Sequence, residues 1–169
     1  HLRNPKNLWI ALADLCDENT EFNAKLEIHL SGNIDGEVLS EIESYSSLKG
    51  KVKNLGYLSH AQVLQQYNEA DLLLLLLFNS KSGVGNYPGK IFEYLAAQKP
   101  ILAFGPERSD TQRLINETKS GLFFNYDSEH LKNEILNIFN VNNEFKTEAL
   151  EKFSREKLAN DLSILLSNI

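Results

Sequence analysis

A run of seven apolar residues, six leucines and then Phe78, follows Asp71. Such a run can form either a buried strand or a buried helix. Its shortness and the helical pattern just before it favour a strand that is buried on both faces. Strands of this kind are typical of parallel sheets covered by helices on both sides. We therefore expect residues 71–78 to form a core strand of an α/β domain.

Helical and strand patterns alternate along the rest of the chain. Further strands are predicted over 25–31, 51–56, 100–104 and 121–125. Two helices are predicted over 37–48 and about 88–98. Caps at Asn4 and Asp127 and capping boxes at Ser59 and Ser109 predict the starts of four more. A last helix is predicted at the C-terminus, with Leu158, Leu162, Leu165 and Ile169 on one face. This order predicts a Rossmann-like domain, with a parallel sheet of about five or six strands flanked by helices.

The composition limits the classes of protein to which the chain can belong. Its 169 residues are enough for one domain, and its net charge of −6 argues against a nucleic-acid partner. Without a leader or an apolar run of about 18 residues, a cytoplasmic location is expected. Cys16 is expected to be a buried thiol. Because the chain opens on a helix with no strand before it, we expect residues 1–169 to be a fragment of a longer protein.

A glycine-rich loop, 82–89, leads into the helix expected over 88–98. In parallel sheets, ligands bind beyond the carboxyl ends of the strands, where this loop should lie. A helix N-terminus with Lys90 beside it suits a phosphate, and the Glu93 carboxylate one turn later can accept hydrogen bonds from sugar hydroxyls. The pairing predicts a nucleotide-sugar site.

Two segments resemble a known family. YNEADLL (67–73) and PGKIFEYLAAQKP (88–100) are similar to the donor-binding half of family 4 glycosyltransferases of the GT-B fold, and the likeness extends from Arg3 to about Phe139. The resemblance implies the C-terminal half of a GT-B protein that binds a UDP- or GDP-sugar for retaining transfer without a metal or other cofactor. The acceptor would bind mainly to a missing N-terminal domain. Bacterial surface-polysaccharide or glycoconjugate synthesis is implied, with possible peripheral association of the full-length protein at the inner face of the membrane.

The resemblance also implies roles for individual residues. Glu93 matches the second glutamate of the family's E-x7-E motif and would hold the ribose; otherwise it is a solvated helix residue. The first glutamate is replaced by Gly85. Lys90 would meet the diphosphate, or instead pair with Glu93 at i,i+3. Arg3 would contact phosphate where the family has a lysine.

The resemblance places further candidates along the expected donor pocket. Gly32 would border the nucleotide, and Tyr57 would either stack on the base or pack on the next helix. The backbone amides of Ser82, Gly83 and Val84 would meet the sugar or the β-phosphate. Gly85 and Ile91 complete the set of candidates, with Asn86 and Tyr87 assisting. The four histidines have no metal-ligand spacing, so no metal site is predicted, and no catalytic residue is assigned.

Two rival functions stay open on the sequence. One is a GT-B epimerase acting on a similar sugar nucleotide, which free rearrangement of the nucleotide sugar without an acceptor would reveal. The other is a non-catalytic nucleotide-binding or receiver-like α/β module. A receiver needs an acidic cluster at the start of the sheet and a lone aspartate at a strand end, and neither is evident in the sequence.

Overall fold

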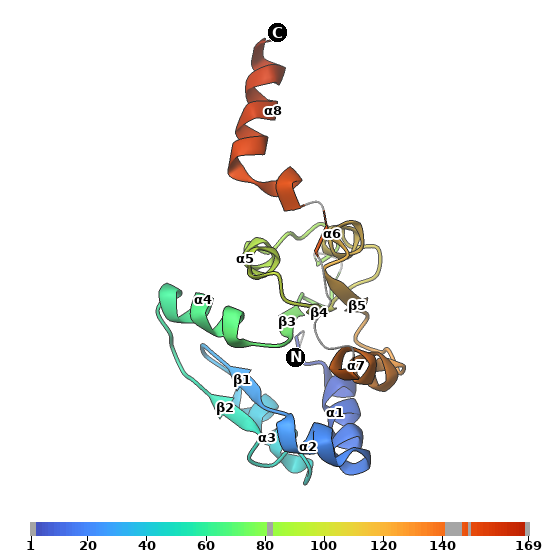
Figure 1. Ribbon diagram of the computed structural model, residues 1–169. Coiled ribbons are helices and arrows are strands. Elements are labelled where there is room, and N and C mark those ends of the chain that lie inside the picture. Colours follow the sequence, from blue (N-terminus) through green and yellow to red (C-terminus); the bar gives the residue numbers. More distant parts are fainter. Residues whose placement is uncertain (1–2, 81–82, 141–146, 149, 168–169) are drawn as a thin grey trace.

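The computed structural model describes residues 3–80, 83–140, 147–148 and 150–167. Helices and strands alternate through most of this range (Figure 1). The strands are β1 (Ile28–Leu30), β2 (Val52–Asn54), β3 (Leu73–Leu76), β4 (Ile101–Phe104) and β5 (Gly121–Phe124). The helices are α1 (Lys6–Glu18), α2 (Thr20–Lys25), α3 (Gly36–Ser44), α4 (His60–Glu69), α5 (Lys90–Ala97), α6 (Asp110–Thr118), α7 (Leu131–Asn140) and α8 (Arg155–Ser167), with a 3-10 turn η2 (Leu150–Phe153).

All the strand pairs are parallel, and the predicted α/β, Rossmann-like class is confirmed. The strands nevertheless divide into two sheets, in the orders β1-β2 and β3-β4-β5, where one sheet was expected. The registers pair Ile28 with Val52, Leu73 with Ile101, and Ile101 with Gly121. No hydrogen-bonded strand joins β1 to β3 within the described residues, so the division lies between these two strands.

The leucine run supplies residues to both faces of its sheet. Leu73, Leu75 and Leu77 pack with the helices α4, α5 and α6 through buried residues such as Tyr67, Tyr94 and Ile115. Leu72, Leu74 and Leu76 pack against a second cluster, built mainly by α1, α3 and α7. This alternation is the period of two expected of a strand with helices on both faces. The interpretation of 71–78 as a core strand is confirmed, although β3 itself is shorter.

Several element bounds differ from prediction because short local contacts end the elements early. The strand expected over 25–31 begins only at Ile28, since Lys25 ends α2, which is capped by the Asn19 side chain. The helix expected over 37–48 ends at Ser44, and a turn follows to residue 50. The strand expected over 51–56 shortens to β2.

Two predicted caps are wrong. Asn4 does not cap α1: the capping position is Pro5, and the Asn4 side chain instead accepts from the Trp9 indole and donates to Glu41. Asp127 does not cap α7, which begins at Leu131. Asp127 lies in a turn in which its amide and the Ser128 hydroxyl both donate to the Asn125 side-chain oxygen. A tertiary contact thus takes the side chain of Asn4, whereas Asp127 lies four residues before the first residue of α7.

The capping box at Ser59 is confirmed, with both reciprocal hydrogen bonds present. At Ser109 only half of the box forms. The Ser109 hydroxyl accepts from the Gln112 amide at 3.2 Å, but the Gln112 side chain accepts from the Arg108 amide rather than from Ser109. Arg108 has a φ of 58°, which turns its amide toward Gln112. The Gln112 side chain thus bonds to the amide of the residue before the cap, Arg108, and not to the amide of the cap itself.

The last helix, α8, extends away from the two sheets (Figure 1). Its predicted apolar face carries Leu158, Leu162 and Leu165, and all three are exposed; Ile169 lies outside the described residues. None of the helices in the described ranges combines the length and the apolar character that a bilayer crossing requires. Cys16 is buried, as predicted, and this burial raises the pKa of its thiol.

Candidate functional site

The carboxyl end of β3 gathers two of the predicted site residues around Phe78. The Arg3 guanidinium lies 3.6 Å from the centre of the Phe78 ring, a cation–π contact. The Gly83 amide donates to the Ser80 carbonyl at 2.9 Å. A Cβ at Gly83 would lie 2.3 Å from the Phe78 carbonyl oxygen, so the chain needs glycine there. Arg3 and Gly83 therefore flank the same residue.

The rest of the glycine-rich loop is held against the start of α6. The Asp110 amide donates to the Val84 carbonyl at 2.8 Å, and the Thr111 hydroxyl donates to the Asn86 carbonyl at 2.6 Å. Val84 is exposed, and Gly85 has open space where a Cβ would lie. The loop is thus anchored through its carbonyls, and Val84 and Gly85 face outward. Ser82, the other loop candidate, lies outside the described residues.

The helix N-terminus predicted to seat a phosphate begins at Lys90. Gly89 occupies the capping position in a helical conformation, and no side chain caps the end. The amides of Ile91 and Phe92 are already bonded to the Pro88 and Gly89 carbonyls, at 2.9 and 3.2 Å. The Ile91 side chain is fully buried in the core. The Ile91 side chain therefore cannot meet a ligand directly, whereas the Lys90 side chain at the same helix end is exposed.

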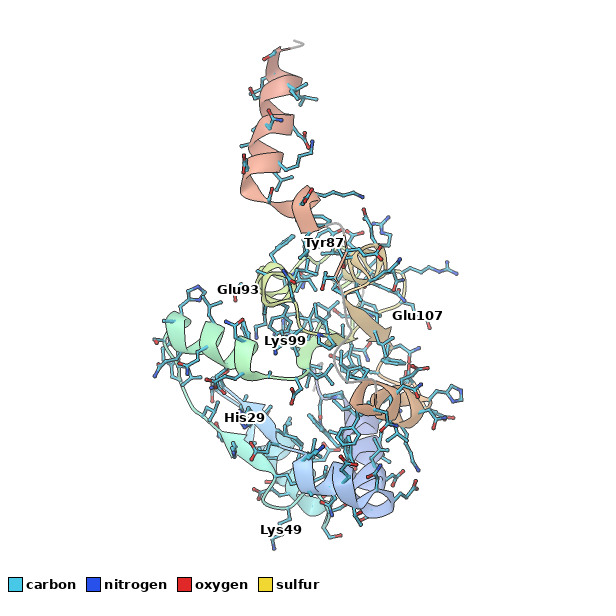
Figure 2. The ribbon with its side chains drawn as sticks, viewed as in Figure 1. His29, Lys49, Tyr87, Glu93, Lys99 and Glu107 are labelled. Atoms are coloured by element: carbon cyan, nitrogen blue, oxygen red, sulfur yellow. The ribbon has the colours of Figure 1, made fainter. Side chains whose placement is uncertain are left out.

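Glu93 lies in a groove of about 500 Å³ between α4 and α5. Figure 2 shows it on the side of α5 that faces α4. The groove is lined from α4 by His60, Leu64, Tyr67 and Asn68 and from α5 by Phe92, Glu93, Ala96 and Ala97. No ion pair joins Glu93 to Lys90 in the described part of the chain, so the i,i+3 pairing is not formed in this structure.

Two buried tyrosines lie near Glu93, and one of them, Tyr67, lines the groove. The Tyr67 and Tyr94 rings meet edge to face, with centroids 4.8 Å apart. Burial and the Glu93 carboxylate both raise the pKa of Tyr67; the same two causes, with Tyr67 itself, raise the pKa of Tyr94 strongly. Both phenols therefore stay neutral at physiological pH, and a neutral hydroxyl can donate a hydrogen bond. The Tyr94 hydroxyl donates to the Leu74 carbonyl at 3.2 Å.

Gly32 and Tyr57 lie at the other sheet. The Gly32 amide donates to the Gly56 carbonyl at 2.7 Å, which brings the carboxyl ends of β1 and β2 together. Both glycines have positive φ, 97° and 62°. Tyr57 follows directly and is 95% exposed. The alternative in which Tyr57 packs on the next helix is therefore wrong, and its ring is open to a ligand.

The structure thus divides the predicted residues into three places. Arg3, Gly83 and Val84 adjoin the end of β3, Lys90 and Glu93 lie on α5, and Gly32 and Tyr57 lie on the first sheet. Among the described residues, no hydrogen bond, ion pair or ring contact joins the candidates of one place to those of another.

The sequence analysis missed Phe78 as a contact of Arg3, and it missed His60 and Asn68 of the groove. The i,i+4 spacing of His60, Leu64 and Asn68 on a capped helix places them on one face, but only the packing of α4 on α5 turns that face toward Glu93.

No family model matches the chain, and no curated protein matches it. The described residues also contain no group of three or more His, Cys, Asp or Glu side chains placed to hold a metal ion.

Proposed function

We propose that the chain is the donor-binding domain of a retaining GT-B glycosyltransferase resembling family 4, and that it binds the nucleoside diphosphate of a UDP- or GDP-sugar. The observation that carries the proposal is Glu93 in the α4–α5 groove, one turn after Lys90. The carboxylate has no hydrogen-bonding or ion-pair partner among the described residues, so it is available to the two hydroxyls of a ribose. The parallel α/β class agrees with a nucleotide site.

Charge supports the same assignment. A diphosphate needs cations or amide donors when no metal neutralises it. Lys90 is exposed and unpaired among the described residues, and Arg3 lies at the carboxyl end of β3 with one face of its guanidinium on Phe78. An arginine stacked in this way keeps its N–H donors free at the edge of the group for phosphate oxygens. Domain closure would bring further donors and exclude water from the donor sugar.

Chemical-shift mapping tests the site directly. UDP and GDP, titrated separately into the ¹⁵N-labelled chain, are expected to perturb the amides of 83–93 together with those of Gly32 and Tyr57. Perturbations confined to α7 and α8 would refute the proposal. Turnover separates the rivals: an epimerase rearranges the free sugar nucleotide without an acceptor, and a non-catalytic module leaves it intact even when the complete protein and its acceptor are present.

A further inference from the structure

Among the described strands, β1 and β3 each have one edge without a hydrogen-bonded neighbour, and these two edges face the interval between the sheets. The same helices cover both sheets. On one face, a single apolar cluster contains Ile28 of β1 together with Leu102 and Phe104 of β4, and Leu74 and Leu76 of β3 pack against it. Helix α1 supplies much of that cluster. The helices on this face therefore cover both sheets as though they were one.

The opposite face is bridged as well. Gln66 of α4 lies 3.1 Å from the His29 ring of β1, and the next residue, Tyr67, packs in the cluster that contains Leu73 and Leu75 of β3. Figure 1 shows the strands in the order β2, β1, β3, β4, β5 across the molecule. Helices thus span the interval between β1 and β3 from both sides, while no hydrogen-bonded strand among the described residues lies in it.

The residues of β3 are those of a central strand. Edge strands in native proteins usually carry charges or proline, which discourage pairing with another chain. β2, on the far side of its own sheet, follows this rule with the exposed Lys53. β3 has leucine at every position, and its leucines are alternately buried and half-buried. A purely leucine edge is the kind that pairs with a further strand.

Among the described residues, backbone amides without a strand partner line both edges. The amides of Leu73 and Leu77 donate to β4 and its extension, so the intervening Leu74 and Leu76 amides point to the other side. In β1 the Ile28 and Gly32 amides donate toward β2, so that of His29 points away from it. The Tyr94 hydroxyl already bonds to the Leu74 carbonyl, whose second lone pair remains for a strand amide.

The position of Arg3 indicates where the missing strand connects. Arg3 stacks on Phe78, two residues beyond the end of β3, and α1 begins at Lys6. A strand that leads into Arg3 and runs parallel to β3 would end beside the carboxyl end of β3. Short strand-to-helix connections of this kind are the rule in α/β domains.

We propose that one extended apolar strand lies between β1 and β3, parallel to both, and that the polypeptide joined to residue 1 supplies it. The sheet then has the order β2, β1, added strand, β3, β4, β5. Numbered along the chain this order is 3-2-1-4-5-6, the arrangement of doubly wound nucleotide-binding domains.

Residue-resolved amide hydrogen exchange tests the proposal without any nucleotide. Three chains are compared: 1–169, the same chain with an N-terminal extension of about eight residues rich in valine and isoleucine, and a control whose extension has two central prolines, which cannot donate and are excluded from central strands. The valine and isoleucine extension is expected to slow exchange at Leu74, Leu76 and His29 by at least about tenfold. The proline control should leave these amides unchanged, and the Leu73 and Leu75 amides should stay protected in all three chains.

Three results would overturn the proposal. The first is protection of the Leu74 and Leu76 amides in the monomeric 1–169 chain that equals their protection in the chain with the valine and isoleucine extension. The edge of β3 would then already be paired without an added strand. The second is no difference between the two extensions. The third is protection that grows with concentration together with a dimer in light scattering, because a second copy would then be the partner.

Discussion

A methyl group at Gly83 would lie 2.3 Å from the carbonyl oxygen of Phe78. The contact is with backbone, which cannot move aside as a flexible side chain would. Gly83→Ala is therefore expected to lower the free energy of unfolding by about 1–3 kcal/mol, as overpacking does. Gly85→Ala, two residues later, meets open space and should change it by less than about 1 kcal/mol, in the stabilising direction. Urea denaturation measures both, and equal losses in the two variants would contradict the described loop.

The open space at Gly85 also admits the glutamate that the family motif has there. Gly85→Glu is expected to fold with an unchanged melting temperature. If the added carboxylate meets the sugar hydroxyls, the affinity for a UDP- or GDP-sugar should rise by about 1 kcal/mol or more relative to UDP or GDP. Calorimetry with each pair of ligands provides the comparison. An equal change for the sugar nucleotide and the plain nucleotide would place residue 85 away from the sugar.

Removal of the Glu93 carboxylate should weaken nucleotide binding. Glu93→Ala is expected to cost about 1.5–3 kcal/mol, the range for a hydrogen bond to a charged group, with no effect on the binding of inorganic diphosphate. Glu134→Ala is the matched control, because Glu134 is also a half-buried glutamate in the first turn of a helix. Equal losses for nucleotide and diphosphate would reject a contact with the ribose.

Lys90 is assigned to phosphate, so its effect should depend on the phosphates of the ligand. Lys90→Ala is expected to weaken UDP or GDP at least about tenfold while leaving uridine or guanosine within about twofold, and the loss should shrink as salt is added. Lys49→Ala tests the general effect of removing an exposed lysine; Lys49 lies at the far end of the molecule from Glu93 (Figure 2). A loss shared equally by nucleoside and nucleotide would indicate altered packing instead.

Tyr126 links stability to high pH. Its hydroxyl donates to the Leu77 carbonyl at 2.6 Å, and burial raises the pKa of Tyr126 to about 12. An unfolded tyrosine has a pKa of about 10, so between about pH 10 and 12 the folded state holds more protons than the unfolded state. The free energy of unfolding should therefore fall as the pH rises through this window. Denaturation of wild type and Tyr126→Phe at several pH values should give a shallower fall in the variant, and identical slopes would reject the assignment.

The alternation of helical and strand patterns along the chain was enough to predict the class of fold. The leucine run after Asp71 predicted a core strand, Ser59 with Gln62 predicted the start of α4, and the loop from Gly83 to Gly89 was expected between β3 and α5. Each of these depends on neighbours within a few residues, because strand period, capping and glycine conformation are local properties. A local pattern failed at Asn4, which was predicted to cap α1. Its side chain instead donates a hydrogen bond to Glu41, which is distant in the sequence.

Tertiary structure alone decided which elements pair and which side chains share a groove. Periodicity indicates that a face is buried but not what covers it. The sequence of α4 therefore could not show that His60 and Asn68 lie across from Glu93. Nor could local sequence show that Tyr57 is exposed or that Arg3 stacks on Phe78. Strand pairing is likewise a contact between segments far apart in the chain. The same leucines that marked β3 as central could not reveal that its free edge and the free edge of β1 lie under the same helices, since that relationship exists only once α1 and α4 have packed across both sheets.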